Sequence, residues 1–286
     1  MNEMKGNSMA VFNSNDIYPV SADSELPFEQ HRDIFHLTGI DQEETILLLY
    51  PPSKDDKTRE ILFIRKSDNH TKVWEGEKLS RKQANELSGI NSIYYIDDFK
   101  DILSSIATKV DTFYINKNEH YRANSPVETR EDRFISWLLK NYPAHNVAKS
   151  NPILQRQRSI KHPDEIDQIK KACDITRRGF NRVLKFIKPS VWEYEIEAEF
   201  IHEFINNSSK GFAYSPIIAS GNDNNVLHYI KNNKQCKSGE LILMDVGAEY
   251  GNYSSDMTRT VPVSGIFSKR QKEIYNAVLR VKNEVT

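Results

Sequence analysis

The chain has 286 residues, with 39 lysines and arginines against 40 aspartates and glutamates. This length allows two domains and a sizeable core, and a charge so near zero argues against a nucleic-acid or membrane-surface partner. No apolar run reaches the length of a signal peptide or a membrane span. The two cysteines, Cys173 and Cys236, have neither metal-ligand nor disulfide spacing, which favours a reducing, cytoplasmic location.

Strands and helices alternate in the first half of the chain. Residues 1–25 are polar and rich in asparagine and serine, so we expect them to be frayed or loosely docked. A helix or an irregular lead follows over 26–39. Four apolar runs predict strands, the first two forming a hairpin with a long loop: 45–50, 60–65, 92–96 and 111–115. Helices are expected at 97–107 and 130–142, which predicts an α/β layer domain.

The second half begins with a polar stretch, 151–158, that we expect to be a linker. A long helix should begin at Pro163, which has the fixed φ that suits a first helical position. Ser190 and Glu193 have the spacing of a capping box for a helix over 191–206. A strand at 212–219 is then expected, and a final helix over 269–283, for which Ser268 and Gln271 form a second capping box.

A pair of aspartates gives the strongest chemical signal. Asp245 lies inside an apolar run, 241–248, that predicts a buried strand, and Asp256 opens the next run. A tight turn at 250–251 would pair residues whose numbers sum to 501, and so would place Asp245 opposite Asp256 with Cβ atoms about 4.5–5.5 Å apart. Two buried carboxylates this close require a cation or a bound proton. Oxygen ligands suit Mn²⁺, Mg²⁺, Ca²⁺ or Zn²⁺. The alternative is a turn aspartate and a solvated one, which the apolar run disfavours.

Two further residues are candidates on weaker grounds. His228 follows the strand expected at 212–219, so that adjacent-strand placement would bring it over the carboxylates. A neutral imidazole there could donate a hydrogen bond to a carbonyl or move a proton, although a lone histidine is more often structural. Trp74 follows the second strand in a polar setting. An exposed tryptophan can be a binding contact, but core packing is the role expected from the sequence alone.

Four stretches together resemble a Xaa-Pro aminopeptidase (aminopeptidase P) of the pita-bread metallopeptidase superfamily. They are Gln30–Gly39, Ile160–Ile166, Ser220–Tyr229 and Met244–Thr260. The spacings of 17 residues from His228 to Asp245 and of 11 from Asp245 to Asp256 fit as well. The resemblance implies an α/β creatinase-like N-terminal domain over 1–155 and an incomplete α+β pita-bread catalytic domain over 156–286.

The resemblance also implies a reaction: removal of an N-terminal residue from a peptide with proline at its second position. Two divalent ions, Mn²⁺ or similar, would share a hydroxide that attacks the peptide carbonyl. Asp245 would chelate one ion, Asp256 would bridge both, and His228 would contact the carbonyl or the developing oxyanion. Trp74 matches a position that lines the substrate pocket, often in a neighbouring subunit, and Tyr214 matches a tyrosine near the metals. Members of the family are commonly homo-oligomers.

The chain departs from the family pattern in its metal ligands. The family completes its site with a histidine and two glutamates that come after the helix at 269–283, and none of the three is present here. Two carboxylates cannot hold two ions alone, and without the second half of the sheet, apolar surface would face water. We therefore expect little or no peptidase activity from this chain by itself.

Three other functions stay open. A prolidase-type dipeptidase activity is closely related to that of a Xaa-Pro aminopeptidase, and the sequence does not exclude it. A creatine amidinohydrolase-like enzyme, in which histidine moves the proton without metal, is disfavoured because both Asp245 and Asp256 are retained. A non-catalytic pita-bread module that binds proteins is favoured by the missing ligands and disfavoured by the intact pair. Metal content separates the peptidases from the last two.

Overall fold

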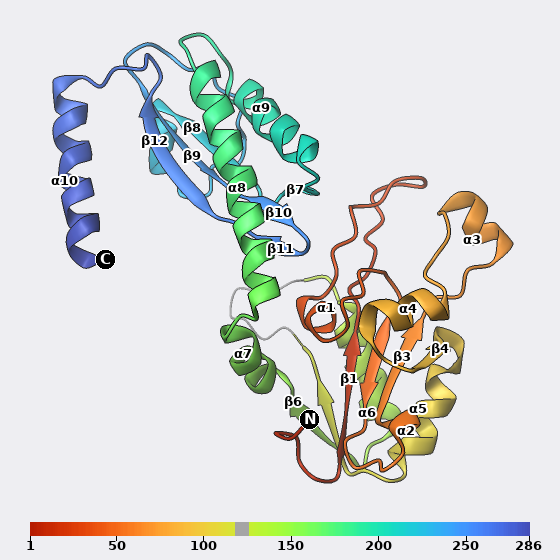
Figure 1. Ribbon diagram of the computed structural model, residues 1–286. Helices are drawn as coiled ribbons and strands as arrows, with labels where there is room; N and C mark the ends of the chain where they lie inside the picture. Colours follow the sequence, from red (N-terminus) through yellow and green to blue (C-terminus); the bar gives the residue numbers. More distant parts are fainter. Residues whose placement is uncertain (118–125) are drawn as a thin grey trace. The chain divides into compact units, whose positions relative to one another are not determined.

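The computed structural model describes residues 1–117 and 126–286. The chain forms two compact units, Met1–Ile160 and Lys161–Thr286 (Figure 1). The division follows Ile160, whereas the sequence suggested residue 155. Each unit has a hydrophobic core of its own. Within the two described ranges, no helix combines the length and the apolar character needed to cross a bilayer.

A six-stranded sheet in the order β4-β3-β2-β1-β5-β6 lies at the centre of the first unit. Its strands are β1 (Ser8–Asn13), β2 (Ile46–Leu49), β3 (Glu60–Ile64), β4 (Ser92–Tyr95), β5 (Thr112–Ile115) and β6 (Asn146–Lys149). The hairpin expected from the second and third of these is confirmed, because β2 and β3 pair antiparallel. The pairs β1–β5, β3–β4 and β5–β6 are parallel.

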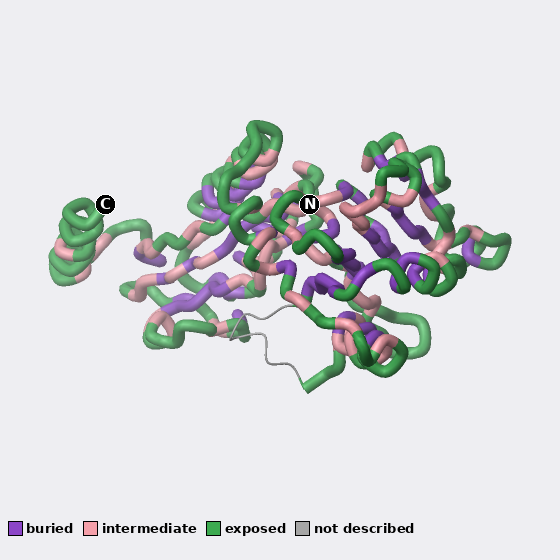
Figure 2. The backbone as a smooth tube through the Cα atoms, turned by 90° about the horizontal axis from the view of Figure 1, so that it is seen from below, coloured by how far each residue is buried: buried purple, intermediate pink, exposed green. Residues whose placement is uncertain are grey.

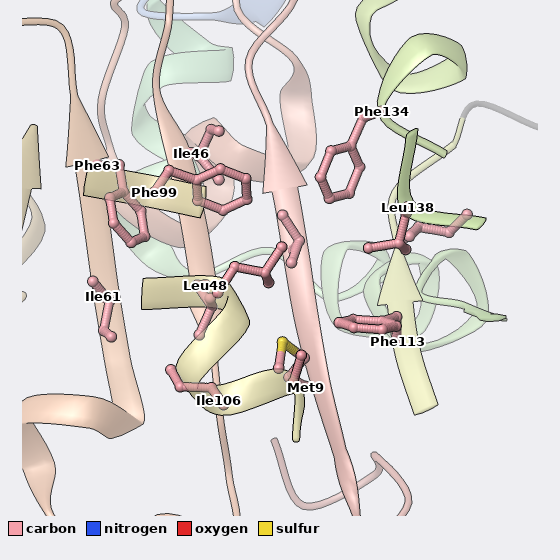
Figure 3. Close-up of a cluster of buried hydrophobic side chains, with 14 of the residues drawn as sticks. Met9, Ile46, Leu48, Ile61, Phe63, Phe99, Ile106, Phe113, Phe134 and Leu138 are labelled. Atoms are coloured by element: carbon pink, nitrogen blue, oxygen red, sulfur yellow. The ribbon is translucent and has the colours of Figure 1, made fainter. Parts of the chain in front are cut away.

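Helices cover both faces of this sheet because its strands are apolar on both sides. Helices α5 (Phe99–Ala107) and α6 (Arg130–Asn141) pack on one face, where Met9 and Phe113 lie in the core (Figure 3). Helices α1 (Arg32–Thr38), α4 (Arg81–Ser88) and α7 (Asn151–Ser159) pack on the other. Two short helices, α2 (Asp56–Arg59) and α3 (Asn69–Trp74), follow β2 and β3. The predicted α/β layer domain is confirmed.

Two expectations for the first unit are wrong. The first 25 residues are not frayed throughout, because residues 8–13 form β1 and are all buried between β2 and β5, whereas residues 18–25 are exposed. The run is short and flanked by polar residues, so its pattern is weak, and it becomes a strand through burial on both faces. The stretch 151–158 is no linker either. It forms α7, which places Leu154 in the core of the first unit.

In the second unit, α8 (Pro163–Phe186) and α9 (Glu193–Asn206) cover one face of the sheet β12-β9-β8 (Figure 1). The strands of this unit are β7 (Gly211–Phe212), β8 (Ile217–Ser220), β9 (Leu241–Val246), β10 (Ala248–Tyr250), β11 (Tyr253–Ser254) and β12 (Met257–Pro262). A second small sheet has the order β11-β10-β7. At Gly179 in α8 an added Cβ would lie 2.8 Å from Phe204, so this glycine permits the close packing of α8 on α9.

Helix caps in the second unit match the sequence in two places and differ in one. The start of α8 at Pro163 and the capping box of Ser268 with Gln271 are confirmed. The box predicted from Ser190 and Glu193 is wrong. The carboxylate that accepts from a backbone N–H at the start of α9 belongs to Glu195, which receives the N–H of Trp192 at 2.7 Å. Glu193 is fully buried instead and bonds elsewhere.

The last helix, α10 (Lys269–Val285), has no buried residue. Its apolar side chains are exposed, with Val278 at 63% and Val285 at 80%. In Figure 2 the helix is drawn almost entirely as exposed and intermediate residues. The expectation that apolar surface of this unit would face water is therefore met at α10.

The carboxyl group of Glu131 in the first unit is buried, which disfavours its charged form. Glu131, in the first turn of α6, is buried, and its Oε2 accepts a hydrogen bond from the amide of Asn13 at 2.8 Å. Burial raises the pKa of the Glu131 carboxyl from 4.5 to about 7, against the opposing effect of that hydrogen bond. Between pH 4.5 and pH 7 the folded chain therefore keeps a proton that the unfolded chain has released.

Stability of the first unit should test the position of β1. Val11 is completely buried in β1 and Val20, in the same N-terminal stretch, is 63% exposed. We expect Val11→Ala to lower the free energy of unfolding by about 2 kcal/mol, because it removes two packed methyl groups and leaves a cavity. The matched Val20→Ala change should lie within about 0.5 kcal/mol of wild type in urea titrations. Equal effects of the two changes would contradict the buried strand.

Stability should also depend on pH through Glu131. A raised carboxyl pKa in the folded state makes stability fall as the pH rises through the window from 4.5 to about 7. The expected loss is about 3 kcal/mol, and Glu131→Gln should remove this slope from urea titrations. Asp132→Asn is the control: hydrogen bonding from Lys117 holds the pKa of Asp132 at about 2, so its contribution changes only at lower pH. An unchanged slope in Glu131→Gln would refute the assignment.

Candidate metal centre

Strands β9 and β12 form the antiparallel ribbon that the sequence predicts, but in another register. Asp245 faces Thr258, and at the end of the ribbon Tyr250 faces Tyr253, so paired numbers sum to 503 and not 501. The cause is the turn, which falls at Gly251 and Asn252 with φ of 57° and 66°. Two successive residues with positive φ make the turn type that matches the twist of paired strands. Asp256 therefore precedes β12 and does not lie directly opposite Asp245.

The expectation that both carboxylates are buried is also wrong. In β9, burial alternates, so that Ile242, Met244 and Val246 enter the core beneath α8 and α9, while Asp245 lies on the opposite, half-buried face. Asp256 is exposed. The apolar run that suggested a strand buried on both sides is buried on one side only.

The backbones of Gly247 and Ser255, on the two sides of the ribbon, approach each other unusually closely. This close approach, called the crossing below, brings Asp256 toward Asp245. A Cβ on Gly247 would lie 1.8 Å from the carbonyl oxygen of Ser255 and 3.1 Å from the ring of Tyr214. Only a glycine fits such an approach. The carbonyl of Gly247 also accepts a hydrogen bond from the N–H of Ala213 at 2.8 Å. This bond fixes Ala213, the residue before Tyr214, beside Gly247.

Tyr214 joins the two carboxylates. The strand expected over 212–219 is interrupted between β7 and β8, and Tyr214 lies in this break. Its hydroxyl lies 2.7 Å from Oδ1 of Asp245 and 3.1 Å from Oδ1 of Asp256, in position to donate to either. Burial, followed by the hydrogen bond to Asp245 and the negative charges of both aspartates, raises the pKa of the Tyr214 phenol far above its usual value. The phenol therefore keeps its proton and acts as a donor to this pair.

The chemistry of this group fits a divalent cation. The phenol has one proton, so it can satisfy only one of the two carboxylate oxygens at a time. The remaining negative charge suits a hard cation, which takes carboxylate oxygens as ligands. Within residues 1–117 and 126–286, no group of three or more histidine, cysteine, aspartate or glutamate side chains is arranged to hold a metal ion. The described chain thus offers the carboxylates of Asp245 and Asp256 to such an ion.

The other two candidates lie in surface positions of their own units. His228 lies in an exposed turn, not on an adjacent strand, and no hydrogen bond or ion pair joins it to Asp245 or Asp256, all three of which are described. Trp74 ends α3 in the first unit and is 75% exposed, so the expectation of core packing is wrong. Its polar surroundings in the sequence were the signal for that exposure. The break in the strand at 213–216 was not expected, although Pro216 was a visible signal for it.

Comparisons with known proteins identify both parts of the chain. The family model for metallopeptidase family M24 matches residues 167–286, and the model for the aminopeptidase P N-terminal domain matches residues 1–114. Residues 167–286 belong to metallopeptidase family M24. It is 31% identical to the Xaa-Pro aminopeptidase of Escherichia coli K12 over 260 residues, which are 91% of this chain and 59% of the relative. It is 30% identical to human Xaa-Pro aminopeptidase 3, over 95% of this chain and 53% of the relative.

Solved structures of the family show the same fold. The aminopeptidase PepP of Pseudomonas aeruginosa superimposes with a TM-score of 0.87 at 28% identity, over 98% of this chain and 63% of that one. Escherichia coli aminopeptidase P with the inhibitor Pro-Leu gives a TM-score of 0.85 at 28% identity, over 97% and 63%. The chain therefore spans about three fifths of the length of these relatives. Its second unit corresponds to part of their pita-bread domain.

Gly247 should be indispensable for the crossing. We expect Gly247→Ala to destabilise the second unit by about 3 kcal/mol, because the new methyl group must displace the backbone of Ser255. Urea unfolding followed through Trp192, the tryptophan of the second unit, would measure this loss. Gly6→Ala is the control, since an added Cβ at Gly6 meets nothing within 4 Å. Equal stability of both variants would show that the crossing is not as close as described.

Proposed function

We propose that this chain is part of a metallo-aminopeptidase that removes an N-terminal residue preceding proline. The observation that carries the proposal is the convergence of Asp245 and Asp256 on one hydroxyl, that of Tyr214, in a chain whose residues 167–286 belong to family M24. Relatives that are named Xaa-Pro aminopeptidases support the specificity. The Escherichia coli structure with Pro-Leu supports a peptide with proline as the class of substrate.

Asp245 and Asp256 would hold a pair of divalent ions together with ligands that these 286 residues do not include. We propose Mn²⁺ for this pair; a zinc-substituted form of the Escherichia coli enzyme supports a divalent ion of this size. When bound, such ions supply a nucleophilic hydroxide and polarise a carbonyl. The proton of Tyr214 would hold the free carboxylate oxygens in place, which limits how far either side chain can turn.

His228 and Trp74 would act on the substrate. The exposed imidazole of His228 is free to donate a hydrogen bond to the peptide carbonyl or to the oxyanion that develops from it. Trp74, with Val73 beside it, presents an exposed apolar surface at the end of α3. A peptide that contains proline would find an apolar contact there. We propose that this contact forms in a homo-oligomer, where α3 can reach the site of another copy.

A cytoplasmic location is part of the proposal. Both cysteines are free thiols, Cys173 exposed and Cys236 buried. Free thiols persist in a reducing compartment.

Metal binding tests the proposed centre directly. Titration of the metal-free chain with Mn²⁺, followed by electron paramagnetic resonance, should show a weak site. We expect Asp245→Asn and Asp256→Asn each to weaken it about tenfold, or 1.4 kcal/mol, because each removes a charged ligand. Asp167→Asn, in an exposed part of α8, is the control for a loss of charge alone. Binding that is the same in all four proteins would rule out a metal site at the pair, and would favour a module without catalytic metal.

Activity of the isolated chain is expected to be little or none. Two carboxylates cannot hold two ions, so a Xaa-Pro peptide with Mn²⁺ should stay intact under conditions in which a complete relative cleaves it. Chromatographic assay of the released residue measures this. Strong manganese-dependent cleavage by the 286-residue chain would show that it needs no further ligands.

A further inference from the structure

Glu193 is the most completely bonded acidic side chain beside the His228 segment. It is the first residue of α9 and is 0% exposed. Its Oε1 accepts hydrogen bonds from the N–H and the hydroxyl of Ser220, at 2.7 and 2.8 Å. Its Oε2 accepts from the hydroxyl of Tyr229 at 2.7 Å and from the N–H of Lys234 at 3.0 Å. Four donors thus compensate a carboxylate that has left water.

These four bonds fix one segment at three points. Ser220 ends β8, Lys234 begins the return of the chain toward β9, and Tyr229 lies between them. His228 is the residue before Tyr229. Its own side chain is exposed and has no hydrogen-bond or ion-pair partner in the described chain, so its position depends on that of its neighbour.

The ammonium group of Lys234 does not neutralise Glu193. It donates to the carbonyl of Ser220 at 3.0 Å and lies 3.4 Å from Asp223. Glu193 is therefore stabilised by hydrogen-bond donors rather than by an ion pair, and each donor lies on the segment that it holds. A glutamine at this position could accept at only one oxygen, and its NH₂ group would face two donors.

Other contacts tie the same segment to the strand that carries Asp245. The side-chain amide of Asn224 donates to the carbonyl of Leu241 and accepts from the N–H of Leu243, both at 3.2 Å. Both partners belong to β9. On the other side, the amide of Asn232 donates to Glu197, one turn after Glu193, at 2.8 Å. The segment is thus held between α9 and β9, with Glu193 at its centre.

We propose that Glu193 is the positioning residue for His228. Its buried carboxylate fixes the two ends of residues 221–233 and the ring of Tyr229, and so sets where the neighbouring imidazole lies relative to the Asp245–Asp256 pair. This role rests on the proposed function, in which His228 meets the substrate carbonyl. Glu193 itself touches neither the substrate nor the metal ligands.

Two readouts on the 286-residue chain test the role. The first is amide hydrogen exchange, in which Glu193→Gln should speed exchange within 221–233 about tenfold over wild type while the sheet of the first unit stays unchanged. The second is nuclear magnetic resonance of the His228 imidazole with added Mn²⁺. In wild type the paramagnetic ion should broaden this resonance by a constant amount set by their distance. In Glu193→Gln the broadening should change although Mn²⁺ affinity is kept, a result that general loss of stability does not produce.

Two further variants complete the design. Tyr229→Phe removes one of the four bonds and should give the same local effect at smaller size, so it carries the test if Glu193→Gln does not fold. Glu199→Gln is the control, since it lies on α9 but bonds to Arg182, away from the segment. If Glu193→Gln and Tyr229→Phe leave exchange in 221–233 at the wild-type rate, or raise it no more than Glu199→Gln does, the positioning role is wrong. If Mn²⁺ does not bind wild type, the proposed metal centre fails, and hydrogen exchange still decides the role of Glu193.

Discussion

The contact on which the second unit depends is the backbone crossing of Gly247 and Ser255. There the chain passes from β9, in the sheet β12-β9-β8, to β10, in the sheet β11-β10-β7. The returning chain passes back from the second sheet to the first between β11 and β12. The crossing is held from the side of α8. The hydroxyl of Thr176 lies 2.7 Å from that of Ser255 and accepts from the N–H of Ala248 at 2.9 Å. Because Thr176 and Ser255 are buried, these polar contacts are sheltered from water and fix how the ribbon turns.

This arrangement explains how two aspartates that are not directly paired come together. Asp245 projects from the last part of a regular ladder, and Asp256 from the irregular residues just beyond the crossing. Tyr214 reaches the same place from the break between β7 and β8, where the N–H of Ala213 bonds to Gly247. Three side chains from three backbone segments thus meet because each segment is anchored on the same glycine. Irregular backbone at such a point is a common way to aim side chains at one centre.

The sequence predicts the regular parts of this molecule well. Pro163 starts α8 and Ser268 caps α10 because both act through local backbone chemistry that needs no distant partner. The pair Asp245 and Asp256 was found from an apolar run and a hairpin, and the structure brings both to Tyr214. The predicted register of the hairpin was wrong because the turn lies at 251–252 and not at 250–251. The choice between these two turns depends on which residues take positive φ. The spatial position of His228 could not be predicted, because its segment is held by Glu193 in α9 and, through Asn224, by the backbone of β9, and both partners are distant from it in the sequence.

The place of β1 in the sheet has a consequence for the order in which the first unit can assemble. The β2–β3 hairpin and its pairing with β1 join residues no more than 39 positions apart, so they can form before β5 has been synthesised. The other edge of β1 pairs with β5, where Val11 faces Ile115 across about a hundred residues. Until the ribosome has released β5, that edge carries unpaired backbone groups and an apolar surface. During translation this half-built sheet is open to strand addition from other chains, so rapid synthesis or chaperone cover over this interval would protect it.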